Sequence, residues 1–206
     1  MTQVKKSIGK HRAQRGFSLL EVMIAMVVLT VGLLAVILAF GTAISATEWA
    51  QEDLIARHKA LDAMESIYTA RNSQQLPFAA IQNIANGGIF LSGPQNLLCA
   101  GADGIVGTAD DVACTAPDTG AACPGGIECL VLPGPDGVLG TIDDETVSLT
   151  NFTRTISFNT IFLPPAQGGG VNTNLIGITI TITYSKPGRW GYNRSYTVNG
   201  LVSSYH

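Results

Sequence analysis

Two stretches of the sequence repeat one set of acidic and small residues whose spacing could bind a metal ion. The stretch GADGIVGTADDV covers residues 101–112, and GPDGVLGTIDDE covers residues 134–145. Calcium prefers several carboxylate and carbonyl oxygens on flexible loops, in which glycines permit tight curvature. The pattern predicts two calcium loops, and the alternative is two solvated acidic turns before strands. The six candidate ligands are Asp103, Asp110, Asp111, Asp136, Asp143 and Asp144.

The repeat is not an EF-hand, because the alternating series of ligands and the distal glutamate are absent. Its pattern Asp-Gly-x-x-Gly-Thr-x-Asp-Asp resembles calcium loops of other bacterial proteins. Calcium is therefore the one cofactor that the sequence suggests.

Four cysteines lie close together and could form two disulfides: Cys99, Cys114, Cys123 and Cys129. They include no C-x-x-C pair and no neighbouring histidine pair, which argues against zinc or thiol redox chemistry. Four cysteines allow three pairings, which the sequence cannot separate. Short local loops favour Cys99–Cys114 and Cys123–Cys129.

One acidic residue stands at the start of a long apolar run. No residue from Val22 to Ile44 is charged, and a helix of that length covers roughly 30–35 Å, the thickness of the hydrocarbon core of a bilayer. An ionisable group at the edge of such a segment is costly unless it is paired. Glu21 therefore predicts an electrostatic partner, and the alternative is a side chain that only reaches the lipid headgroups.

The charges around this run predict its orientation. Five basic residues and no acidic one precede Gly16, whereas all 15 acidic residues follow it. A short basic segment before an apolar helix stays in the cytoplasm, and the rest is translocated. The membrane orientation accounts for the basic cluster, and no other part of the sequence resembles a nucleic-acid-binding surface. The three histidines are scattered and no catalytic motif occurs, so we expect no enzyme.

The elements that carry these residues follow from the hydrophobic pattern. The lack of proline between Phe17 and Leu76 predicts one helix, whose amphipathic part ends near Pro77. Alternation predicts strands at 146–158, with a bulge between Leu149 and Phe152, and at 175–184. We expect the apolar face of this sheet to pack on a helical stripe formed by Trp49, Leu54, Leu61, Met64, Ile67 and Tyr68.

These observations divide the chain into segments. Residues 1–16 form a basic leader, 17–44 the membrane and assembly part of the helix, and 45–76 its amphipathic part. Residues 77–206 form a globular head, of which 78–145 are loop-rich with the acidic repeats and cysteines, and 146–206 are a β-sheet.

The residues Gly16-Phe17-Ser18-Leu19-Leu20-Glu21, after a basic leader and before some twenty apolar residues, resemble the class III signal of type IV pilins and pseudopilins. The continuation LLEVMIAMVVLTVGLLAV is most similar to PilV-like minor pilins. The resemblance covers about residues 1–70, and the rest of the chain carries no motif of the family. It implies an α+β fold in which a long N-terminal helix lies against a C-terminal antiparallel sheet.

The resemblance also implies a processing step and partners. Prepilin peptidase would cut between Gly16 and Phe17 and methylate the new Phe17 amine. Glu21 would pair with such an amine, in the family that of an adjacent subunit, and guide assembly of a helical filament of pilins. The inner-membrane assembly platform would be a further partner. The precursor would be a single-pass protein of the inner membrane with a cytoplasmic N-terminus and a periplasmic head, and would then move to the pilus at the cell surface.

The implied function is that of a minor pilin that primes pilus assembly or acts at the filament tip. One alternative is a minor pseudopilin of a type II secretion system. Another, of a different class, is an adhesin displayed on a pilin stem. Stoichiometry, position in the filament and any surface ligand stay open at this point.

Overall fold

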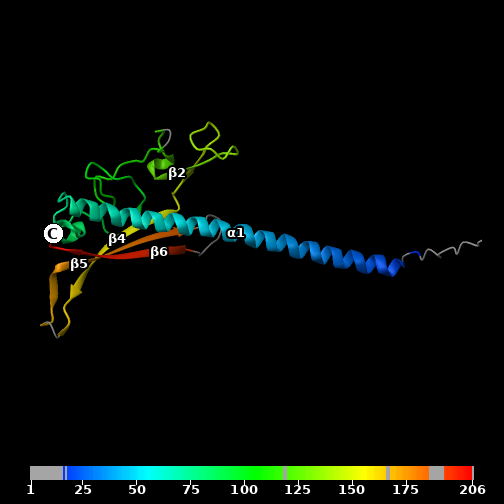
Figure 1. Ribbon diagram of the computed structural model, residues 1–206, viewed down its shortest axis with the longest axis horizontal. Helices are drawn as coiled ribbons and strands as arrows, with labels where there is room; N and C mark the ends of the chain where they lie inside the picture. The colour runs from blue at the N-terminus through cyan, green and yellow to red at the C-terminus, as the bar shows by residue number, and fades with distance from the viewer. Residues whose placement is uncertain (1–15, 17, 118–119, 166–167, 186–192, 206) are drawn as a thin grey trace, which may run out of the picture. The chain divides into compact units, whose positions relative to one another are not determined.

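One continuous helix runs through two compact units of the chain. The computed structural model describes residues 16, 18–117, 120–165, 168–185 and 193–205. The boundary between the units falls between Trp49 and Ala50. The helix α1 (Leu19–Asn72) belongs to both units, as the absence of proline predicts. All the strands of the described residues lie in the second unit (Figure 1).

The helix ends before the proline that was expected to end it. Its last residue is Asn72, and Gln74 adopts a left-handed conformation with a φ of 63°. A left-handed residue cannot continue a right-handed helix. The segment predicted as amphipathic helix up to residue 76 is therefore helical up to Asn72.

The main sheet has four antiparallel strands in the order β1-β4-β5-β6. They are β1 (Gln95–Asn96), β4 (Phe152–Phe162), β5 (Val171–Ser185) and β6 (Asn193–Ser203). A separate ribbon pairs β2 (Cys129–Leu132) with β3 (Glu145–Ser148). The loop-rich segment also contains three single-turn 3-10 helices, η1 (Phe78–Ala80), η2 (Ile84–Asn86) and η3 (Pro124–Gly126). The long helix packed on an antiparallel sheet confirms the predicted α+β, type IV pilin-like architecture.

Strand β5 supplies the centre of the core by simple alternation. Ile178, Ile180, Ile182 and Tyr184 are all at most 1% exposed. The threonines between them lie on the other face of the sheet, where Thr181 and Thr197 share a hydrogen bond between their hydroxyls. The apolar and polar faces of this strand follow the predicted period of two.

The helical face that packs on the sheet is built from small residues, which differs from the prediction. Leu54 and Leu61, expected in the stripe, are 55% and 42% exposed. The buried residues of this face are Ala56, Ala60, Ala63, Met64, Ile67 and Ala70, of which Met64 and Ile67 belong to the predicted stripe. Because the sheet presents large isoleucine side chains, the helix can approach it closely only with small side chains. The predicted stripe is therefore right at Met64 and Ile67 and wrong at Leu54 and Leu61.

The predicted bulge in residues 146–158 is wrong, because this segment belongs to two sheets. Strand β3 ends at Ser148 in the ribbon, and β4 begins at Phe152 in the main sheet. Leu149 between them is 2% exposed, and its amide donates to the carbonyl of Glu128. The change of phase in the apolar alternation marks the point where the chain passes from the ribbon to the main sheet.

Side chains of α1 cover part of the open edge of β6. The Tyr68 hydroxyl donates to the Leu201 carbonyl and accepts from the Leu201 amide, both at 3.2 Å. Arg71 donates to the carbonyls of Ser203 and Ser204 at 3.4 and 3.1 Å. An unpaired strand edge would otherwise present these groups to another chain.

The Tyr184 hydroxyl donates to Asp53 on α1, and burial together with this carboxylate raises the pKa of Tyr184 to about 12. The pKa of Tyr184 is higher in the folded state than the ordinary phenol pKa of about 10, so protonated Tyr184 stabilises the fold. This contribution is complete below pH 10 and is lost as the pH rises to about 12.

Tyr184→Phe is expected to remove this pH dependence between about 10 and 12. It should also lower the free energy of unfolding at pH 7 by about 1–3 kcal/mol, because a buried hydrogen bond to a charged group is lost. Urea unfolding across this pH range measures both effects. Tyr205→Phe is the control, because Tyr205 is 74% exposed, and an equal response of both variants would contradict the prediction.

Candidate functional site: the N-terminal segment and the acidic loops

The predicted cleavage position lies directly before the first turn of α1. Gly16 is exposed and outside regular secondary structure, whereas Phe17 and residues 1–15 of the leader lie outside the described residues. A β-carbon at Gly16 would meet no atom within 4 Å. The fold itself therefore has no steric need for glycine at this position. The predicted cleavage would supply such a need, because a peptidase must admit an extended backbone.

Glu21 lies in the first turn of α1 and is exposed. The Ser18 carbonyl accepts hydrogen bonds from the amides of Glu21 and Val22 at 3.0 and 3.2 Å. Ser18 is thus the N-cap and Glu21 the third helical residue, which is the spacing of a capping box and a signal that the sequence analysis missed. An acid in the first turn also interacts favourably with the helix dipole.

The surroundings of Glu21 on the helix are apolar. Glu21 lines a shallow surface hollow together with Val22, Ala25, Met26 and Leu29. Among the salt bridges of the described residues, none includes Glu21. The carboxylate therefore lacks a cation within the part of the chain that the structure describes.

The apolar run after Glu21 is exposed along its whole length. Its most apolar window of 18 residues has a mean hydropathy of 3.0 and is 0% buried. Side chains such as Leu29 and Leu38 are 69% and 70% exposed. Among the described residues, α1 is the one helix long and apolar enough to cross a membrane. A continuous surface of this kind requires lipid or other apolar helices around it.

The two acidic loops are closed by their own carboxylates. In the first, Asp103 accepts from the amide of Ile105 at 2.8 Å, and the Thr108 hydroxyl donates to Asp110 at 2.6 Å. Asp111 accepts from the Gly107 amide at 2.8 Å. The second loop has the same three hydrogen bonds. The Val138 amide donates to Asp136 at 2.8 Å, the Thr141 hydroxyl to Asp143 at 2.6 Å and the Gly140 amide to Asp144 at 2.6 Å.

These contacts alter the acidity of the loop carboxyls. The hydrogen bond from the Thr108 hydroxyl is the main cause that lowers the pKa of Asp110. Thr141 does the same for Asp143. Burial, in contrast, raises the pKa of Asp111. The first loop therefore differs from the second in having one carboxylate inside the head.

The conformation of both loops is held by hydrogen bonds among their own residues. Their carboxylates accept hydrogen bonds from their own backbone and threonine hydroxyls, and an ionised carboxylate, with about four lone-pair sites, keeps further acceptor positions for a cation. Within the described ranges, no group of three or more His, Cys, Asp or Glu side chains is placed to hold a metal ion. Calcium binding by the six aspartates stays a prediction, which thermal melting with added millimolar calcium can test.

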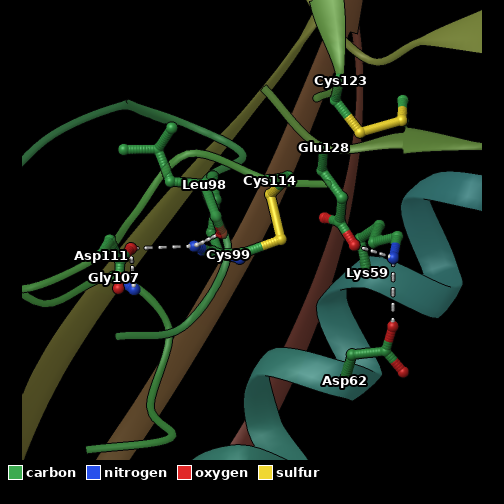
Figure 2. Close-up of a disulfide and its surroundings, with 11 residues drawn as sticks. Lys59, Asp62, Leu98, Cys99, Gly107, Asp111, Cys114, Cys123 and Glu128 are labelled. Carbon is green, nitrogen blue, oxygen red and sulfur yellow. Dashed lines mark hydrogen bonds and ion pairs between the residues drawn. A yellow bond between two sulfur atoms is a disulfide. The ribbon is translucent and has the colours of Figure 1, made fainter. Parts of the chain in front are cut away.

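The structure joins the cysteines in the pairs that short loops favour, Cys99–Cys114 and Cys123–Cys129. Cys114, Cys123 and Cys129 are each at most 5% exposed and form a small core with Ala116. Figure 2 shows Lys59 of α1 beside this cluster, where it pairs with Glu128 and, at 3.6 Å, with Asp62. The disulfides therefore hold a loop-rich segment that an ion pair attaches to the helix.

A buried arginine under the first loop was not found from the sequence. Arg154 on β4 is 3% exposed, and its guanidinium lies 3.5 Å from the Asp111 carboxylate and 3.5 Å from the Leu98 carbonyl. The sequence feature that could have indicated it is that Arg154 is the one charged residue in β4. This ion pair connects the acidic loop to the main sheet.

The comparisons with known proteins concern the N-terminal segment. Residues 11–44 match the family model described as the prokaryotic N-terminal methylation motif. No curated protein and no solved structure matches the chain. The match includes the predicted cleavage position, Glu21 and the apolar run. The chain therefore carries, at residues 11–44, the N-terminal methylation motif that is the class III signal of type IV pilins and pseudopilins.

Proposed function

We propose that this chain is a minor pilin, a structural subunit of a type IV pilus that primes assembly or acts at the filament tip. Prepilin peptidase cuts it between Gly16 and Phe17 and methylates the Phe17 amine. Before assembly it is a single-pass protein of the inner membrane with a periplasmic head, and after assembly it is exposed at the cell surface.

One observation carries this proposal: the methylation motif precedes an apolar helix that is exposed from Leu19 to Ile44 while the head has its own core. A soluble protein would bury such a helix. A pilin surrounds it first with lipid and then with the helices of neighbouring subunits. The helix thus fits a protein that passes from a membrane into a filament.

The proposed pairing of Glu21 follows from the charge that cleavage creates. The new amine on Phe17 is positive and lies four residues before Glu21 in the sequence. In an apolar environment each of the two charges is costly alone, and pairing removes much of that cost. A neighbour in the wrong register leaves both unpaired, so the pair selects the register of assembly.

The head offers a further apolar surface for neighbours in a filament. Leu54 and Leu61 are seven residues apart, so they lie on one side of α1, and both are substantially exposed. This side differs from the alanine-rich side that packs on the sheet. It would be a contact surface of the second unit for neighbouring subunits.

Deletion of the gene tests the proposal when piliation, twitching motility and protein secretion are scored together. We expect piliation and twitching to fall and secretion to persist, with full recovery after complementation by the wild-type gene. Loss of secretion with normal pili would instead show a pseudopilin of a type II secretion system. Loss of attachment with normal piliation would show an adhesin.

A further inference from the structure

The two acidic loops have one conformation but different surroundings. Gly104 and Gly137 both have a φ of 70°, and Gly107 and Gly140 both have a φ of 87°. With the three matching hydrogen bonds described above, the loops are structural copies of each other. What one copy contacts therefore indicates what the other copy can contact.

The first loop, residues 101–112, is docked on the head of its own chain. Ile105 and Thr108 are each 2% exposed, and the Gly107 carbonyl accepts from the Leu91 amide at 2.9 Å. Gly107 has a φ of 87°, which favours glycine, and a β-carbon there would lie 2.6 Å from the Cδ1 atom of Ile156. Asp111 completes the contact by pairing with Arg154. These surroundings form a socket for the first loop. It consists of the apolar side chain of Ile156, the backbone at Leu91 and the buried Arg154.

The second loop, residues 134–145, presents the same side chains to solvent. Val138, which corresponds to Ile105, is 56% exposed, and Leu139 is 54% exposed. Asp144, which corresponds to Asp111, has no salt bridge among the described residues. Ile142 stands where the first loop has Ala109 and is fully exposed at 106%. An exposed apolar tip that its own fold does not use is typical of a protein contact surface.

We propose that residues 134–145 form a docking loop for another protein. The partner surface that fits this loop offers an arginine for Asp144, an apolar wall for Val138 and Leu139, and an extended backbone segment beside Gly140. This is the chemistry of the socket that holds the first loop in the same chain. The proposal does not depend on whether the assembly is a pilus or a secretion pseudopilus.

The partner is a different protein rather than a second copy of this chain. The socket of each copy is already filled by its own residues 101–112. A membrane surface is also a poor fit, because Asp136, Asp143, Asp144 and Glu145 would meet the negative headgroups of anionic lipids. A protein with a basic and apolar site fits both the charge and the shape of the loop.

Photo-crosslinking in the native cells tests this proposal with the full-length chain. Ile142→p-benzoylphenylalanine should give one main adduct, at least tenfold above Ala109→p-benzoylphenylalanine, the matched position on the docked loop. Mass spectrometry of the adduct should place the crosslink in a peptide with an arginine among apolar residues. Equal yields at the two positions, an adduct to lipid or an adduct to a second copy would overturn the proposal.

A pair of conservative variants tests the role of the carboxylate. Asp144→Asn in the crosslinking chain should reduce the adduct at least about tenfold, because it removes the charge that meets the arginine. Asp143→Asn should leave the yield unchanged, since the corresponding Asp110 does not contact the socket arginine. Unchanged melting temperatures show that both variants are folded. An equal effect of the two variants on the yield would overturn the assignment of Asp144.

Discussion

Glu21→Ala is expected to leave membrane insertion and cleavage intact and to reduce incorporation into filaments at least tenfold. The substitution makes the helix more apolar, so insertion has no reason to fail. It removes the acidic residue proposed to pair with the new Phe17 amine, which then stays unpaired among apolar helices. Such a charge costs at least a few kcal/mol, and each kilocalorie is about a fivefold change in an equilibrium. Immunoblotting of sheared filaments and of membranes measures incorporation and cleavage separately.

Two further variants separate the charge of Glu21 from its role in the first helical turn. Glu21→Gln keeps the capping-box spacing with Ser18 but has no charge, and it should assemble as poorly as Glu21→Ala. Ser18→Ala weakens the cap and keeps the charge, and it should assemble almost normally. Normal incorporation of Glu21→Gln would show that the carboxylate does not select the register through an ion pair.

The sequence predicted the structure wherever a single hydrophobic period or a single motif determines the local conformation. The uncharged run after Glu21 predicts the exposed apolar half of α1, because no interior of a small head could bury it. The alternation around Ile180 predicts a strand with one buried face, because successive side chains of a strand point to opposite faces. The local disulfide loops follow from separations of 15 and 6 residues.

Features that depend on contacts between distant segments could not be predicted in this way. Leu54 and Leu61 fit an apolar stripe as well as the alanines do, and only the bulky sheet favours small residues such as Ala60. The acidic repeat shows two equal loops, but only the fold shows that one of them lies over Arg154. The phase change after Leu149 has the same pattern whether a strand bulges or moves to another sheet.

Asp111→Ala is expected to lower the free energy of unfolding by about 3–5 kcal/mol, the cost of leaving a buried charge without its partner. Arg154 and Asp111 have side chains that are 3% and 6% exposed, so water cannot replace the lost carboxylate. Without Asp111, the guanidinium keeps the Leu98 carbonyl and the attraction of Glu128, whereas its Nε atom has no hydrogen-bond partner among the described residues. Chemical unfolding of the detergent-solubilised chain, followed by circular dichroism, measures this loss.

The second acidic loop supplies the matched control for this prediction. Asp144 accepts the same backbone hydrogen bonds as Asp111, from Gly140 and Thr141 instead of Gly107 and Thr108. Asp144→Ala should therefore cost only about 1 kcal/mol, the value of loop hydrogen bonds alone. The difference between the two alanine variants isolates the ion pair. Adding Arg154→Met to Asp111→Ala should recover most of the lost stability, because the buried charge is then gone as well. Equal losses in the two loops, or no recovery in the double variant, would show that the first loop is held by its apolar contacts rather than by the ion pair.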